Sequence, residues 1–148
     1  GVQFARIKPV RRCLDKIDMA YKGDVSRLVD VCRQTIFFRC IRDLHACLDA
    51  IATDPSLEVV RVKSTMTTTP PGSTPQSLAG LRFVSVNVRL VTPESRSLFC
   101  SSHVCEVLLM LTKFGDCLTP EVHKHYLAFR NCTRTMSDLW AFYRLFIP

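Results

Sequence analysis

The chain has 148 residues, which is enough for one domain with a proper hydrophobic core but not for two. Apolar residues at 47% and charged residues at 22% are typical of globular proteins and argue against a disordered chain. No apolar run approaches the ~18 residues of a membrane-spanning helix, and the first ten residues lack the apolar core of a signal peptide. The net charge of +7 fits an acidic partner, nucleotide phosphates, nucleic acid or a merely solvated basic surface. Without an arginine-rich arm, the nucleic-acid alternative is the weaker one.

In chain order, the pattern over the first 63 residues predicts two helices, a strand, a third helix and a second strand. The first helix spans residues 8–21, with Pro9 in its first turn. A short helix follows, beginning at Asp24 or Ser26 and ending at about Val31. A β-branched and aromatic run predicts a strand over 34–40, and an apolar stripe at helical spacing predicts a helix over 41–53. Alternation of apolar and charged residues predicts a strand over 58–63.

The second half of the chain begins with a polar, proline-broken segment, residues 64–79, which we expect to be a flexible loop. Strands are predicted over 80–91 and 98–111, joined by a loop at 92–97 and paired as an antiparallel hairpin. Helices are predicted over 119–132 and from Ser137 or Asp138 onward. The last helix is rich in aromatic residues, namely Trp140, Phe142, Tyr143 and Phe146. This order predicts a single α+β domain, residues 1–148, with a mixed sheet of about five strands flanked by helices.

The spacing of the cysteines does not indicate a metal site or a disulfide framework. Eight are present, without a C-x-x-C motif and without a Cys/His cluster at zinc-ligand spacing. A chain of this length does not need disulfide bonds for stability, and most of its cysteines lie within apolar runs. We therefore expect reduced cysteines in the hydrophobic core and an intracellular location, cytoplasmic or organellar.

Two carboxylates lie beside or within predicted strands. Asp30 comes just before the first strand, and Glu106 interrupts an otherwise apolar strand. Two carboxylates on neighbouring strands could hold Mg²⁺ against a nucleoside triphosphate. Alternatively, Glu106 is an ordinary outward-facing strand residue.

Basic residues upstream of the first strand are the natural partners of phosphate. Arg suits bidentate phosphate contacts, and Lys supplies a point charge. These residues would converge only if the first two helices pack near Asp30; otherwise they decorate amphipathic helices. A second pair of basic residues flanks the flexible loop and could either contact a substrate or lie on a solvated strand edge. The first group is Arg6, Lys8, Lys16 and Arg33, and the second pair is Lys63 and Arg82.

Several familiar site motifs are absent from the sequence. It contains no glycine-rich phosphate loop, no dinucleotide fingerprint, no H-E-x-x-H and no G-x-S-x-G. His123 and His125 are two residues apart on a predicted helix and would point to different faces, so joint metal binding is not expected.

From about Phe4 to Arg130 the chain resembles the RelA/SpoT-like nucleotidyltransferase-fold family, the guanosine tetraphosphate (ppGpp) synthetase domain. Each matching motif is short. Arg6-Ile7-Lys8 looks like the family's R-x-K segment, and Lys16 like the lysine in the helix that follows. Asp30 to Arg33 resembles the region that supplies a magnesium-binding Asp. Gly80-Leu81-Arg82 resembles G-Y-R, His103 to Leu108 the strand with the second catalytic carboxylate, Glu106, and His123-x-x-Tyr126 the closing H-x-x-Y.

Departures from the family pattern concern the acceptor side more than the donor side. Leu81 stands where the family has a Tyr that stacks on the acceptor guanine, a loss of ~1–3 kcal/mol if nucleic-acid stacking values apply. Leu108 stands where the family has Gln, and Lys63-Ser64-Thr65 lacks the basic residue expected after the lysine. The carboxylate pair Asp30 and Glu106 is retained.

The resemblance implies two alternative functions. The first is a Mg²⁺-dependent enzyme that transfers pyrophosphate from ATP to a guanosine nucleotide. Asp30 and Glu106 would be catalytic and bind the metal, and the basic residues named above, with His123 and Tyr126, would bind nucleotides. The second is an inactive homologue retained as a binding or structural subunit of a larger protein or nucleoprotein assembly. A protein partner would then dock on the aromatic C-terminal helix.

Overall fold

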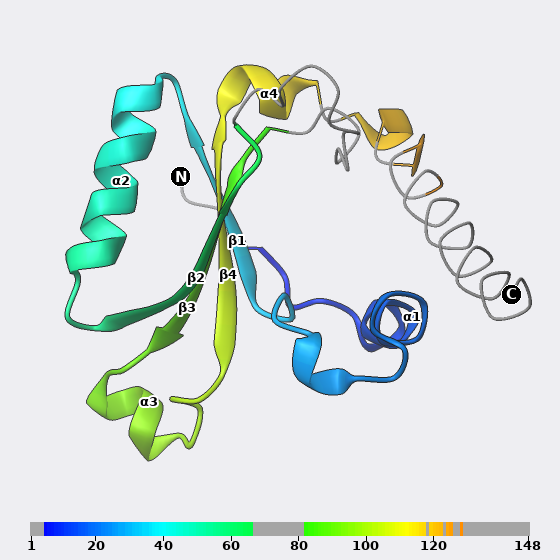
Figure 1. Ribbon diagram of the computed structural model, residues 1–148, viewed down its shortest axis with the longest axis vertical. Coiled ribbons are helices and arrows are strands. Elements are labelled where there is room, and N and C mark those ends of the chain that lie inside the picture. Colours follow the sequence, from blue (N-terminus) through cyan, green and yellow to red (C-terminus); the bar gives the residue numbers. More distant parts are fainter. Residues whose placement is uncertain (1–4, 67–81, 118, 123, 126–127, 129–148) are drawn as a thin grey trace, which may run out of the picture.

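The structure is a computed structural model that describes residues 5–66, 82–117, 119–122, 124–125 and 128. Its helices lie on both sides of a single sheet, with α2 on one side and α1 on the other (Figure 1). The helical elements are α1 (Val10–Tyr21), the 3-10 turn η1 (Val25–Arg27), α2 (Ile41–Thr53), α3 (Pro93–Ser97) and α4 (Thr112–Asp116). The strands are β1 (Arg33–Phe38), β2 (Leu57–Ser64), β3 (Val84–Leu90) and β4 (Val104–Leu111).

The sheet is mixed and has the strand order β1-β4-β3-β2. β3 pairs antiparallel with both β2 and β4, so the predicted hairpin is confirmed. β1 pairs parallel with β4, from Arg33 opposite Glu106 to Phe38 opposite Leu111. The α+β class is confirmed, but the described residues form a sheet of four strands, fewer than the prediction of about five.

The hydrophobic core lies between α2 and one face of the sheet. Alternate residues of β3 and β4 point to this face, because successive strand side chains point to opposite sides. Val86 and Leu109 are 0% exposed, and Leu44 of α2 packs against them at 3%. Helix α2 has the predicted bounds, and its apolar stripe supplies Cys47, Leu48 and Ile51 to the same cluster.

The N-terminal helix ends as its sequence suggests. After Tyr21 the backbone turns through two residues with positive φ, Lys22 and Gly23, and both of their amides bond back to the Ile17 carbonyl. Gly23 tolerates this conformation without strain because it has no Cβ. The short helix predicted to follow is only the 3-10 turn η1, capped by the Asp24 side chain, which accepts from the Ser26 amide.

Two predictions in the β3–β4 connection are wrong. Residues 92–97 were expected to be a loop, yet Thr92 caps the helix α3, with Pro93 in its first turn. The strand was expected to begin at Leu98 but begins at Val104, because the chain turns at Phe99, whose φ is 55°. Helix α4, directly after β4, was not expected at all.

The described cysteines are all free thiols. Their predicted place in the core is confirmed only in part, since Cys47 and Cys105 pack against it, whereas Cys40, Cys100 and Cys117 are exposed. None of the helices formed by the described residues is both long and apolar enough to span a membrane. The loop prediction beyond Met66, most of the predicted helix over 119–132, and the aromatic helix lie outside the described residues.

Candidate nucleotide site

Polar and charged side chains occupy the face of the sheet opposite α2. One row of register partners crosses all four strands on this face: Arg33 of β1, Glu106 of β4, Asn87 of β3 and Arg61 of β2. Partners in a register point to the same side, so the row places the Glu106 carboxylate between a guanidinium on one side and an amide on the other. The sheet thus presents a carboxylate between a cation and an amide on this face, whereas the opposite face is apolar.

Asp30 lies three residues before Arg33, in the segment that leads into β1. It is only 6% exposed, and its Oδ2 atom accepts from two ammonium groups, Lys8 Nζ at 2.6 Å and Lys16 Nζ at 2.8 Å. The backbone supports this arrangement, since the Lys8 amide donates to the Val31 carbonyl at 3.0 Å. The structure therefore brings together two segments whose convergence the sequence left open, and they meet at Asp30.

The ionisation of this cluster follows from burial and from its charges. Burial alone would raise the pKa of Asp30, but the hydrogen bonds from Lys16 and Lys8 lower it overall. Burial opposes the charged form of Lys16 too, yet hydrogen bonds to Asp30 and Tyr21 raise its pKa. Burial lowers the pKa of Lys8 despite its bond to Asp30, and the nearby charges of Lys16 and Arg33 act in the same direction. The two lysines thus hold Asp30 in its charged form.

Glu106 is held from both its backbone and its side chain. Its amide donates to the Cys32 carbonyl at 2.9 Å, which continues the β1–β4 ladder beyond Arg33. Its Oε1 atom accepts from the Ser85 hydroxyl at 2.7 Å. Glu106 is half-buried, so part of its side chain stays accessible to a ligand.

The remaining predicted site residues are less engaged. Lys63 is exposed and is the register partner of Ser85, so it lies on the same face as Glu106. Arg82 donates from Nη1 to the Thr65 carbonyl at 2.9 Å, which ties it to the end of β2. Arg6 is exposed, and its neighbour Ala5 bonds to the Gln34 side chain of β1 at 2.8 Å. His123 and Tyr126 lie outside the described residues.

Several polar residues at the site were not predicted. Ser85 and Asn87 are both 6% exposed, and the Asn87 Nδ2 atom has no hydrogen-bond partner among the described residues. Their alternation with valines in β3 was visible in the sequence and marks a second, polar face of this strand. Tyr21 was also missed: Lys16 and Arg27 both lie over its ring, each 5.2 Å from the centroid.

Comparison with known proteins identifies the fold. No protein-family model matches the sequence, and no curated protein shows significant similarity to it. Among solved structures, small alarmone synthetase 1 of Bacillus subtilis bound to its product pppGpp is 14% identical, with a TM-score of 0.56 over 94% of this chain and 77% of that one. Small alarmone synthetase 2 of the same organism is 17% identical, with a TM-score of 0.59 over 93% and 72%.

A GTP pyrophosphokinase family protein from Streptococcus pneumoniae is also similar, at 12% identity and a TM-score of 0.56, over 92% of this chain and 70% of that one. The chain therefore has a RelA/SpoT-like nucleotidyltransferase fold, as the sequence motifs implied. At identities this low, the structural similarity establishes the fold alone. An activity has to be argued from the chemistry of the site.

Proposed function

We propose that the chain binds ATP with Mg²⁺ on the polar face of its sheet and transfers pyrophosphate from ATP to a hydroxyl of a guanosine nucleotide. One observation carries this proposal. Lys8 and Lys16 both pair with the buried carboxylate of Asp30, and the charge of Arg33, the register partner of Glu106, acts on Lys8. Triphosphate binding requires such a concentration of positive charge, and the similar folds include a structure bound to its product pppGpp.

The carboxylates fit a magnesium ion. The Oδ1 atom of Asp30 is buried and has no hydrogen-bond partner among the described residues, and the Oε1 atom of Glu106 accepts from the Ser85 hydroxyl. Carboxylate oxygens are ligands that Mg²⁺ prefers. Bound there, the ion would neutralise charge on the triphosphate.

The chain's own residues would act in sequence. The triphosphate draws Lys8 and Lys16 away from Asp30, which frees the Asp30 carboxylate. Arg33 neutralises charge that develops on the transferred group. Glu106, oriented by Ser85, accepts the proton of the attacking hydroxyl as that oxygen bonds to the β-phosphorus. The bond from this phosphorus to the bridging oxygen breaks, and AMP leaves.

A second function, nucleotide or partner binding without catalysis, is favoured by Leu108. This residue follows Glu106 by two positions in β4 and is the register partner of Ser85, so it puts an apolar side chain on the polar face. An apolar side chain at that place cannot form a hydrogen bond to a nucleotide. An inactive homologue in a larger assembly would keep the fold without needing a polar residue there.

Calorimetry with ATP, GTP and GDP in the presence of Mg²⁺ tests both functions, combined with chromatographic detection of AMP and of the pyrophosphorylated guanosine nucleotide. We expect Lys8→Gln and Lys16→Gln each to weaken ATP binding about 10- to 100-fold, which corresponds to one charge-assisted hydrogen bond of ~1.5–3 kcal/mol. Glu106→Gln should keep ATP binding and abolish AMP release.

Lys113→Gln and Glu121→Gln change exposed residues of α4 and of residues 119–122 and serve as matched controls. Nucleotide binding without AMP release in the unmodified chain would leave only the binding function. If no nucleotide binds, the proposed transferase is wrong.

A further inference from the structure

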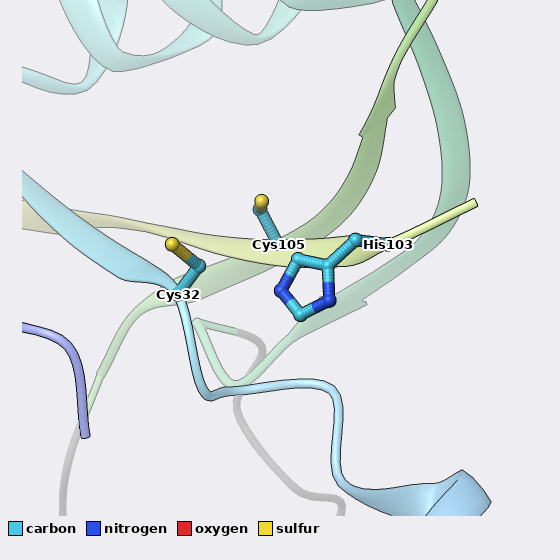
Figure 2. A group of neighbouring side chains, drawn as sticks. All are labelled: Cys32, His103 and Cys105. Atoms are coloured by element: carbon cyan, nitrogen blue, oxygen red, sulfur yellow. The ribbon is translucent and has the colours of Figure 1, made fainter. Parts of the chain in front are cut away.

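Two thiols and an imidazole meet at the start of β1 and β4. The Sγ atoms of Cys32 and Cys105 and a ring nitrogen of His103 all lie within 4.8 Å of one another. Figure 2 shows the three side chains around the point where the two strands begin side by side. Cys32 and Cys105 are half-buried, and His103 is exposed. We call these three residues the Cys–His cluster.

The parallel register explains why these residues meet. Arg33 pairs with Glu106, so the residues one step earlier, Cys32 and Cys105, also lie next to each other. Neighbours in parallel strands point to the same side, and His103, two residues before Cys105, follows the same alternation. The Cys–His cluster thus lies on the opposite side of the strands from Glu106. Cys32 is remote in sequence from His103 and Cys105, so no spacing motif predicts the cluster.

We propose that Cys32, His103 and Cys105 bind a zinc ion, with water as the fourth ligand. Thiolate sulfur and imidazole nitrogen are the preferred zinc ligands, at about 2.3 Å and about 2.0–2.1 Å respectively. Ligands at these distances in a tetrahedron lie roughly 3.3–3.8 Å apart. Atoms within 4.8 Å of one another reach that geometry by small side-chain rotations. The donor set, which lacks a carboxylate, selects a soft metal over Mg²⁺.

The surroundings supply access and leave the fourth position open. A cavity open to solvent reaches His103, with Val29, Phe99 and Cys100 among its lining residues. The Cys100 thiol is occupied elsewhere, since it donates to the Ser95 carbonyl at 3.5 Å, and it is not a member of the cluster. A cation can therefore enter from the side of His103 and keep one solvent ligand.

Zinc here would fasten the first residues of β1 to the first residues of β4. At present one backbone bond, from the Glu106 amide to the Cys32 carbonyl, joins the strands at this point. The zinc site is independent of the proposed transferase, because its ligands lie on the other side of the strands.

Zinc affinity of the full chain, measured in a non-thiol reductant by competition with a chromophoric chelator, tests the proposal. We expect one zinc ion per chain. Cobalt in its place should show thiolate-to-metal charge-transfer bands and the strong visible absorption of a tetrahedral site. Cys32→Ser, His103→Ala and Cys105→Ser should each weaken zinc binding by about 100-fold or more, beyond the 10- to 100-fold typical of an outer-shell change.

Cys100→Ser, in the loop beside the cluster, and His45→Ala, an exposed histidine of α2, are matched controls and should bind zinc normally. His103 is exposed, so His103→Ala tests the site even if the cysteine variants fail to fold. Sub-stoichiometric binding, equal binding by His103→Ala, or a loss in Cys100→Ser as large as that in Cys105→Ser would overturn the proposal. Loss of zinc binding with nucleotide binding retained would separate this site from the proposed transferase site.

Discussion

The two faces of the sheet are built by the same strands but depend on different forces. On the side of α2, Val86 and Leu109 are excluded from solvent and packed by dispersion and the hydrophobic effect. On the other side, Asp30 and Glu106 are held by ion pairs and by a single hydroxyl. The stability contributed by the apolar face should depend on side-chain volume and little on salt or pH. The stability contributed by the charged cluster should depend on charge and little on side-chain shape. Substitutions on the two faces should therefore lower the free energy of unfolding by different amounts and under different conditions.

Removing volume from the apolar face should have the largest effect. Leu109→Ala is expected to lower the free energy of unfolding by ~2–5 kcal/mol, because the cavity cannot fill between the sheet and α2. Chemical denaturation measures this change. Leu98→Ala, at a side chain that is 72% exposed, should change stability by less than ~0.5 kcal/mol. Equal effects of the two variants would contradict the assignment of the core.

Removing the charge of Asp30 should come next. Asp30→Asn keeps the shape but leaves the Lys8 and Lys16 ammonium groups without their anion, at an expected cost of ~1–3 kcal/mol in unfolding free energy. Asp18→Asn changes an exposed residue of α1 and is the matched control. A stability of Asp30→Asn equal to that of the control would show that the cluster contributes nothing to the fold.

The same ion pairs predict a sensitivity to acid. The pKa of Asp30 is lowered in the folded chain, so its stabilising effect is complete above the ordinary value of about 3.9 and is lost as the pH falls through the lower, folded value. At alkaline pH, the raised pKa of Lys16 and the lowered pKa of Lys8 act in opposite directions. Unfolding measured from pH 5 downward should therefore show the stability advantage over Asp30→Asn shrinking; a constant difference would contradict this linkage.

The smallest effect is expected at an exposed pair on the polar face. Arg89 of β3 donates to Glu58, its register partner in β2, and both side chains reach solvent. Glu58→Gln should cost less than ~1 kcal/mol, because water and salt screen the pair. Added salt should reduce this cost further while leaving Leu109→Ala unchanged. A salt-independent loss would mean that the pair packs like the core.

Much of the fold could be predicted because its elements carry local signals. The apolar stripe of α2 defined that helix to the residue, and alternation identified β2 and β3. Predictions failed where local signals overlapped, as in residues 98–103, whose apolar residues resemble a strand although Phe99 turns the chain. Thr92 followed by Pro93 was a helix start, but the short polar segment was interpreted as a loop.

The site could be predicted only where its residues are charged. Asp30, Lys8 and Lys16 stood out as charges, and the structure brings them together. Ser85 and Asn87 did not, because their alternation with valines indicates a polar strand face but not a ligand. The Cys–His cluster could not be found from spacing at all, since its proximity depends on the register of two strands that are remote in sequence.

That pairing of remote strands also affects how the chain folds. β3 and β4 are near neighbours in sequence. β1 and β4 are adjacent in the sheet, but α2, β2 and β3 lie between them in the sequence. Closing so long a loop costs entropy before any contact offsets it, so β1 should join late and, as an edge strand, leave first. Amide hydrogens of β1 should then exchange faster than those of β3. The proposed nucleotide site would then be lost by partial opening, before the rest of the sheet unfolds.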